Sequence, residues 1–286
     1  MLSPRVLRRR IKSVQSTAKI TRAMEMIATA KMKRTQEAAL AGRPYAEKMT
    51  YVIGHLAASL SGDADATPAF LKSRDVKRIG IVHITTDRGL CGALNSSVNR
   101  QAASFILKEG KPVSVVAVGK KGREFMSRNA LEVRAEFMGV GDAPKIVDTL
   151  PVSRVIMEDY LSGYVDLVYL SYPRFISTMV QRPVIEQLIP VEPVPLERGQ
   201  LADYIYEPNV TVVLDRLLPR FVEMQVFHAV LEAIASEQSA RMVAMRNATD
   251  SAKEMVADLT LALNKARQEM ITKELLDITG GVAALT

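Results

Sequence analysis

The residues best suited to chemistry lie together in the segment HITTDRGLCGALN (83–95). Cys91 could act as a nucleophile if His83 and Asp87 lay beside it and the start of a helix lowered the pKa of the thiol. The segment also places two glycines between an apolar run and a helical pattern, where α/β proteins bind phosphate groups. The spacing fits neither common phosphate-binding fingerprint. A tight strand-to-helix turn with a buried cysteine is the simpler prediction.

Other catalytic and metal-binding patterns are missing from the sequence. His55 and His228 lie in helical patterns without ligand-spaced companions, and there is no H-E-x-x-H motif. The single cysteine excludes an internal disulfide framework and a multi-cysteine metal site. We therefore expect a protein with no catalytic residues, no cofactor and no metal.

Positive charge is concentrated at the amino-terminal end of the chain. The 286 residues carry a formal net charge of +7, and residues 1–50 alone hold 12 basic and three acidic residues. The run Arg8–Arg10 could bind nucleic acid, but Tyr45 and Tyr51 are the only aromatic residues nearby for stacking on bases. A docking surface for an acidic protein and a solvated helix face are the other two interpretations.

The elements that position these residues follow from glycine and proline usage. Residues 220–279 contain neither, which predicts one uninterrupted helix between Pro219 and Gly280. Such a helix is about 90 Å long, whereas a globule of this size is about 50 Å across, so we expect the helix to project. Apolar residues recur along it in steps of three and four, which predicts a heptad seam. The seam is expected on Met245, Ala248, Ala252, Met255, Leu259, Ala262 and Ala266.

A second long helix is predicted over residues 5–58, with a kink or a break at Gly42-Arg43-Pro44. The two helical stretches lie at opposite ends of the chain, which favours an antiparallel coiled coil with a domain inserted between its helices. The stripe of the second helix is expected on Leu7, Ile11, Val14, Ala18 and Thr21, with a drift to Met24, Ile27 and Ala28.

The inserted region alternates between short β-branched runs and helical patterns, which is typical of an α/β sheet. Strands are expected at 76–85, 112–118 and 164–170, and helices at 93–109, 120–129 and 144–162. The breaker-rich stretches 61–68 and 190–199 are interpreted as joints. The predicted fold class is α/β: a long antiparallel coiled coil of the N- and C-terminal helices with an inserted Rossmann-like α/β domain. The predicted parts are 1–60, 75–195 and 209–286.

No apolar run approaches the roughly 18 residues that span a bilayer, and the basic start lacks the apolar stretch of a signal peptide. We therefore expect a soluble protein of a reducing compartment. The end of the chain is short and apolar, so it would be exposed unless a partner surrounds it or it packs back on its own coil. The residues concerned are Leu275, Leu276, Val282, Ala283 and Leu285.

Four colinear segments together resemble the gamma subunit of F-type ATP synthases, and the resemblance covers nearly the whole chain. They are RRIKSVQSTAKITRAMEMIATAKMKR (9–34), TTDRGLCGALNSSV (85–98), LPRFVEMQVFHAVLEAIASEQSARMVAMRNATD (218–250) and NKARQEMITKELLDITGG (264–281). Val282 stands where the family usually has Ala, for which we expect only a small packing difference. The cysteine-bearing insertion of the chloroplast version is lacking, so no thiol switch is expected.

The resemblance implies a rotor that performs no bond chemistry. The coiled coil would lie inside a hexameric ring of alternating alpha and beta subunits, and the α/β domain would contact the epsilon subunit and the ring of c subunits. Proton flow would turn this shaft and change the nucleotide affinities of the beta subunits. The protein would bind no nucleic acid and would be peripheral to the cytoplasmic side of a bacterial inner membrane.

The resemblance also implies contact residues on both helices. Lys19, Arg22 and Met24 would face an acidic loop of beta. Arg267, Gln268 and Thr272 would meet the loop of beta that catches the shaft, with Arg241 assisting in coupling. Without the resemblance, the residues leave two other classes of protein open. One is a basic coiled-coil nucleic-acid-binding or scaffold protein, and the other is a small α/β enzyme that uses Cys91.

Overall fold

The computed structural model describes residues 3–59, 67–129, 131–192, 207 and 209–283. The chain divides into two compact units, Met1–Ala28 with Arg241–Thr286 and Thr29–Ala240. The predicted joint at 61–68 lies almost wholly outside the described residues, and so does most of the joint at 190–199.

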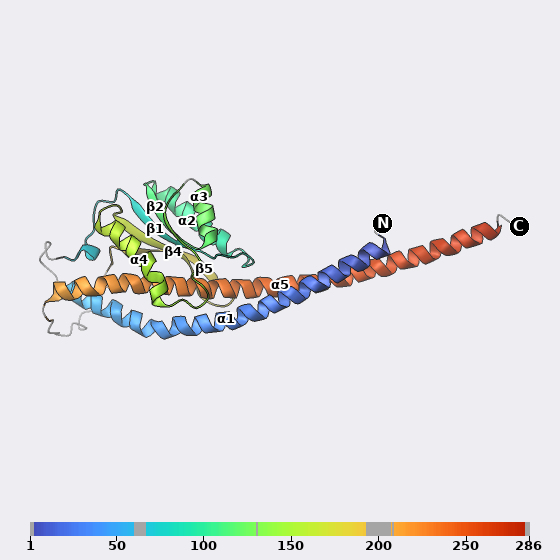
Figure 1. The fold of residues 1–286 in the computed structure, drawn as a ribbon, viewed down its shortest axis with the longest axis horizontal. Coiled ribbons are helices and arrows are strands. Elements are labelled where there is room, and N and C mark those ends of the chain that lie inside the picture. Colours follow the sequence, from blue (N-terminus) through green and yellow to red (C-terminus); the bar gives the residue numbers. More distant parts are fainter. Residues whose placement is uncertain (1–2, 60–66, 130, 193–206, 208, 284–286) are drawn as a thin grey trace. The chain divides into compact units, whose positions relative to one another are not determined.

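Two long helices contribute to both units (Figure 1). Helix α1 spans Pro4–Ser59, and helix α5 spans Val210–Ala283, 74 residues or roughly 110 Å at 1.5 Å per residue. Both predicted long helices are confirmed, but the predicted break in α1 is wrong, because the helix continues through Gly42 and Pro44. A Cβ on Gly42 would lie 2.5 Å from Cε1 of His228, so the glycine lets α1 and α5 approach closely there.

In the first unit the two helices run antiparallel, as predicted. Thr21 contacts Thr249 and Glu25 contacts Arg246, so residue numbers rise along α1 as they fall along α5. On both helices one stripe of buried and half-buried positions follows steps of four and three, the period of a coiled coil. We call these positions the seam: Leu7, Ile11, Val14, Ala18, Thr21, Glu25 and Ala28 on α1, and Met245, Thr249, Ala252, Val256, Leu259, Leu263 and Ala266 on α5.

The observed seam corrects the predicted one at several positions. On α5, Thr249, Val256 and Leu263 lie in the seam, whereas Met255 and Ala262 are exposed and Ala248 is half-buried beside it. On α1 the stripe does not drift. Ile27 is 55% exposed, and Glu25 occupies the next heptad position. The prediction was wrong because it sought apolar side chains, while the pairing of the helices places a hydroxyl and a carboxylate at seam positions.

The second unit contains a five-stranded sheet in the order β3-β2-β1-β4-β5. The first four strands are parallel, and β5 pairs antiparallel with β4. The strands are β1 (Ile79–Ile84), β2 (Val113–Val118), β3 (Glu132–Phe137), β4 (Leu167–Phe175) and β5 (Gln181–Ile189). The three predicted strands correspond to β1, β2 and β4, but the strand predicted at 164–170 begins at Leu167 and continues to Phe175. The two edge strands were missed.

Helices cover both faces of this sheet. Helices α2 (Leu94–Glu109) and α3 (Lys120–Arg128) pack on one face, where Ala102 and Met126 join strand residues in one apolar cluster. Helix α4 (Ile146–Leu161) and the first part of α5 pack on the other face, in a cluster that includes Leu218. A short 3-10 turn, η2 (Ala69–Leu71), adds Phe70 to the second cluster. The predicted helices of the insert and its Rossmann-like architecture are confirmed.

Candidate functional site

His83 is a core residue of the sheet. Its ring is fully buried on β1, with Nε2 2.8 Å from Oδ1 of Asn99 and Nδ1 3.1 Å from Oγ of Ser171. An amide oxygen only accepts, so Nε2 carries the hydrogen and Nδ1 accepts from the Ser171 hydroxyl. Burial lowers the pKa of His83 to about 4, against the opposing hydrogen bond to Asn99. The imidazole is therefore neutral at pH 7, with both nitrogens in use.

Asp87 holds backbone groups of neighbouring loops. The N–H of Lys120 donates to Oδ1 at 2.9 Å, and the N–H of Gly139 donates to Oδ2 at 2.9 Å. Because Lys120 is the first residue of α3, the carboxylate satisfies an otherwise unpaired amide and lies at the positive end of the helix. Asp87 thus joins the ends of β1 and β3 to the start of α3.

Cys91 is buried in a hydrogen-bonded turn between β1 and α2. The Asn95 amide donates to Sγ of Cys91 at 3.3 Å and to Oγ1 of Thr86 at 2.8 Å. Its Oδ1 accepts from the N–H of Thr86. Leu90 and Gly92 adopt left-handed backbone angles, with φ of 63° and 59°, which lets the chain reverse within a few residues. The prediction of a tight turn with a buried cysteine is confirmed.

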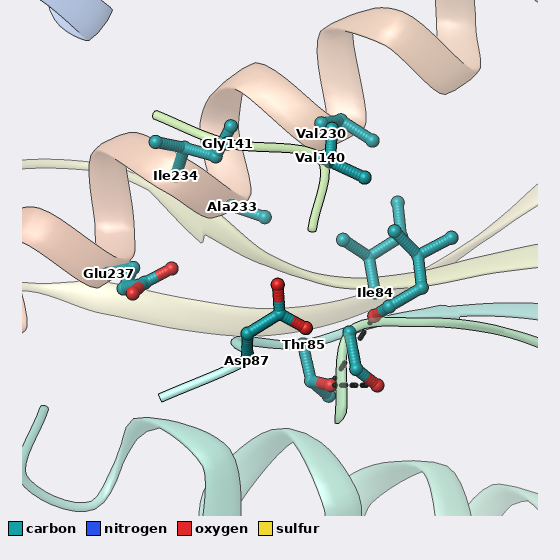
Figure 2. Close-up of a pocket in the computed structure, with 11 residues that line it drawn as sticks. Ile84, Thr85, Asp87, Val140, Gly141, Val230, Ala233, Ile234 and Glu237 are labelled. Atoms are coloured by element: carbon teal, nitrogen blue, oxygen red, sulfur yellow. Dashed lines mark hydrogen bonds between the residues drawn. The ribbon is translucent and has the colours of Figure 1, made fainter. Parts of the chain in front are cut away.

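A small cavity lies at the carboxyl ends of β1 and β2 (Figure 2). Ile84 and Asp87 line it from the sheet side, and Val230, Ala233 and Ile234 line it from α5. The cavity holds about 40 Å³, room for about one water molecule. Helix α5 therefore covers the carboxyl ends of β1 and β2.

Two kinds of feature are absent from the residues that the structure describes. No group of three or more His, Cys, Asp or Glu side chains is arranged to hold a metal ion. No helix in this part of the chain is long and apolar enough to cross a membrane.

A charged cluster lies in the seam of the first unit, centred on Glu25, which is 3% exposed. Nη1 of Arg22 donates to Oε2 at 2.8 Å, and Nε of Arg246, on the other helix, donates to Oε1 at 3.0 Å. Burial raises the pKa of Glu25, but the bonds and charges of Arg246 and Arg22 outweigh it and hold the pKa below its usual value. Glu25 is therefore ionised at neutral pH and ties α1 to α5.

A pair of threonines forms the next layer of the seam. Oγ1 of Thr21 lies 2.7 Å from Oγ1 of Thr249, and Oγ1 of Thr249 lies 2.8 Å from the carbonyl oxygen of Met245. Oγ1 of Thr21 lies 3.1 Å from the carbonyl oxygen of Ala18. Each hydroxyl has one hydrogen, so one threonine donates to the carbonyl of its own helix while the other donates to that threonine. Glu25 lies four residues after Thr21, so the heptad spacing alone places it in the seam. The sequence-based prediction missed it because a charged side chain is unusual at such a position.

The predicted contact residues fall into two groups, one where α1 and α5 are paired and one farther along α5. Lys19 and Arg22 are exposed and Met24 is half-buried, all within six residues of α1 and next to Glu25. Arg241 is half-buried on α5, about 8 Å along the helix from Arg246 at 1.5 Å per residue. The structure thus brings the predicted residues of α1 to the charged cluster and places Arg241 near it.

The other predicted contact residues lie farther along α5. Arg267, Gln268 and Thr272 are exposed, and the Thr272 hydroxyl donates to the carbonyl of Gln268 at 2.9 Å. Continuing the register of Thr21 with Thr249 puts Pro4, where α1 begins, opposite Ala266. The three residues therefore lie past the start of α1, at least 27 Å from Thr249 at 1.5 Å per residue.

The end of α5 is apolar and exposed, as predicted. Leu275 is 57% exposed and Leu276 is 65% exposed, so the alternative of packing back on the coil is wrong for these two residues. The side chains of Val282, Ala283 and Leu285 lie outside the described residues.

Fold and site together define a class of protein: an antiparallel coiled coil that carries an α/β domain, with the first part of one long helix packed on a face of the sheet. The family model described as ATP synthase matches residues 3–285. The ATP synthase gamma chain of Dehalococcoides mccartyi (strain CBDB1) is 58% identical over 285 residues, with 100% of both chains covered. The chain belongs to the ATP synthase gamma chain family.

Solved structures of lower identity share the fold. A chain of the Euglena gracilis mitochondrial ATP synthase in rotational state 3 is 20% identical, with a TM-score of 0.67 and coverage of 99% of this chain and 94% of that chain. A chain of the Tetrahymena thermophila mitochondrial ATP synthase, described as central stalk and c ring, is 24% identical, with a TM-score of 0.59 and coverage of 80% and 99%.

Proposed function

We propose that this chain is the central rotor stalk subunit of an F-type ATP synthase. It couples proton flow through the membrane ring to ATP synthesis and hydrolysis at the beta subunits by rotation. The observation that carries this proposal is the full-length identity of 58% to a chain named ATP synthase gamma chain. The solved Tetrahymena chain of the same fold, described as part of a central stalk, supports it.

The physical properties of the helix pair suit a shaft. A rod that transmits torque must be stiff, and α1 and α5 are continuous helices over 56 and 74 residues. The two helices must also not slide along each other. The polar contacts of Thr21 with Thr249 and of Glu25 with Arg246 fix one register of the pair. Charged contacts on the outside let a shaft engage a partner at defined angles without deep interlocking.

The residues proposed to contact the beta subunits form the two groups described above. Lys19, Arg22 and Met24 face the acidic loop of beta, and Arg241 assists coupling near them. Arg267, Gln268 and Thr272 meet the catch loop of beta. The exposure of Lys19, Arg22 and the three residues near the end of α5 supports these assignments, since a contact residue must be accessible.

The chain itself is non-catalytic in this proposal. The polar atoms of His83 and Asp87 are used inside the α/β domain, and α5 covers the carboxyl ends of β1 and β2. Its partners are the alpha and beta subunits, the epsilon subunit and the c-subunit ring. Through that assembly it is peripheral to the cytoplasmic side of a bacterial inner membrane. Its working parts are the helices 1–60 and 209–286 and the domain 75–195.

Co-purification tests the proposal. A tagged chain expressed in its native cells is expected to recover alpha and beta subunits, with three copies of each for one copy of this chain. Recovery without these subunits, or together with duplex DNA in a salt-dependent manner, would contradict the proposal and favour a basic nucleic-acid-binding coiled coil.

A further inference from the structure

Glu25 is the one charged side chain among the seam positions that the structure describes in the first unit. The positions before and after it on α1 are Thr21 and Ala28. An apolar residue at such a site commonly gives equal or greater stability than a buried ion pair, because both charges must lose water. Stability of the coil therefore does not explain a carboxylate at this position.

The geometry shows what the carboxylate does. Its two oxygens are divided between two helices, since Oε2 accepts from Arg22 on α1 and Oε1 accepts from Arg246 on α5. Glu25 is buried, whereas the side chains of Arg22 and Arg246 are 60% and 59% exposed. A buried anion thus fixes the guanidinium groups of two long, otherwise mobile side chains at the surface of the helix pair.

Both guanidiniums keep donors for a further ligand. Arg22 donates to Glu25 through Nη1, and Arg246 donates through Nε. A guanidinium has five N–H donors in a planar fork, so most of them remain for an external carboxylate, which can bind such a fork through two parallel bonds. The charges of both arginines also act on nearby Asp250, which is paired with Lys253. These five residues, three basic and two acidic, still leave one net positive charge, so the surface stays attractive to an acidic partner.

We propose that Glu25 is a positioning residue that presents Arg22 and Arg246 as one fixed pair of cations to an acidic segment of the surrounding ring. This proposal rests on the proposed function, because it names how the contact at Arg22 is oriented. It also adds Arg246 to the contact. Preorganised side chains lose less conformational freedom on binding, so a fixed pair engages at a sharper rotation angle than two free side chains.

The test uses the reconstituted complex with Glu25→Leu, Glu25→Gln and Arg22→Gln variants, and Glu254→Gln as the control. Leucine suits the seam, and both arginines are exposed enough to regain water, so Glu25→Leu is expected to melt at or above the wild-type temperature. Protons pumped per ATP hydrolysed are expected to fall at least threefold in Glu25→Leu and Glu25→Gln. Glu254 is exposed on α5, and its substitution is expected to leave that ratio unchanged.

A double variant separates positioning from a merely structural role. Arg22→Gln alone is expected to lower the pumping ratio, but in the Glu25→Leu background it is expected to add little, since Arg22 acts through the pose that Glu25 holds. A folded Glu25→Leu complex with a wild-type ratio overturns the proposal, even if Arg22→Gln is impaired. A wild-type ratio in Arg22→Gln also overturns it and removes Arg22 from the proposed contact. Failure of the unaltered chain to assemble with alpha and beta overturns the proposed function itself.

Discussion

The hydroxyl oxygens of Thr21 and Thr249 lie 2.7 Å apart in the seam of the helix pair, although 228 positions separate them in the sequence. A slip by one heptad would leave Thr21 opposite Met242 or Val256 instead. Its hydroxyl would then keep the carbonyl oxygen of Ala18, 3.1 Å away on its own helix, but it would lose its hydrogen bond to the other helix. The hydrogen bond between the two threonines thus favours one register of two helices whose apolar positions repeat every heptad, together with the contact of Glu25 with Arg246.

Replacing Thr249 by valine tests this selection. The Thr249→Val change keeps the shape but removes the hydrogen bond between the helices, while Thr21 can still donate to the carbonyl of Ala18. We therefore expect a loss of about 1 kcal/mol in the free energy of unfolding. Thr260→Val is the matched control, because Thr260 also donates to a carbonyl four residues earlier but is exposed. Urea unfolding of the full chain measures both. Equal stability of the two variants would contradict the role of the threonine pair.

Protonation of His83 should make the stability of the α/β domain depend on pH. Burial lowers the pKa of His83 to about 4, while an unfolded histidine titrates near 6.5. Between these values the unfolded chain binds a proton that the native chain does not, so stability falls as the pH is lowered from about 6.5 to about 4 and is unaffected above that range. Across that pH range, the protonation of His83 is expected to lower the free energy of unfolding by about 3 kcal/mol.

The measurement for His83 is urea unfolding at several pH values between 7.5 and 4.5, with His83→Gln as the comparison. Glutamine does not titrate, so the variant should lack this part of the pH dependence, whatever its own stability at pH 7.5. Parallel pH profiles of the two proteins would show that His83 does not cause it.

Gly122 is predicted to be required for the packing of α3 on the sheet. A Cβ at this position would lie 2.6 Å from Cδ2 of His83 and 2.7 Å from Oγ1 of Thr85, both in well-packed surroundings. Gly122→Ala is therefore expected to cost about 1–3 kcal/mol of unfolding free energy through overpacking. Gly89→Ala is the control, since a Cβ there has open space around it. A Gly122→Ala protein as stable as Gly89→Ala would contradict this account.

The sequence predicts the centre of the sheet better than its edges. Strands β1 and β2 and the first half of β4 are mostly apolar because they are central in the sheet and largely buried. Strand β3 carries Glu132, Arg134 and Glu136 on its more exposed side, and β5 contains Pro183, which an edge strand tolerates. Such edge strands resemble loops in the sequence, so their pairing is set by the neighbouring strand and not by local pattern.

The seam of the two long helices is likewise only partly predictable from local sequence patterns. Apolar periodicity places Leu7, Ile11 and Val14 correctly, because each faces the partner helix through its own hydrophobicity. Glu25 lies in the seam because Arg246 of the other helix neutralises it. That contact depends on the register of a segment 221 positions away, which no local pattern encodes. The same contact makes Glu25 the centre of the candidate site.

Met24 provides a direct test of the proposed coupling contact. It is half-buried on α1 between Arg22 and Glu25, so Met24→Lys adds a positive charge at the surface that is proposed to slide past an acidic loop. An extra ion pair there would hold the shaft at one angle, and we expect ATP synthesis per proton to fall in reconstituted vesicles. Met26→Lys is the control, because Met26 is 64% exposed and lies outside the seam. Both variants add the same charge, so a loss confined to Met24→Lys assigns the effect to this contact. Unaltered ATP synthesis per proton in Met24→Lys would remove Met24 from the coupling surface.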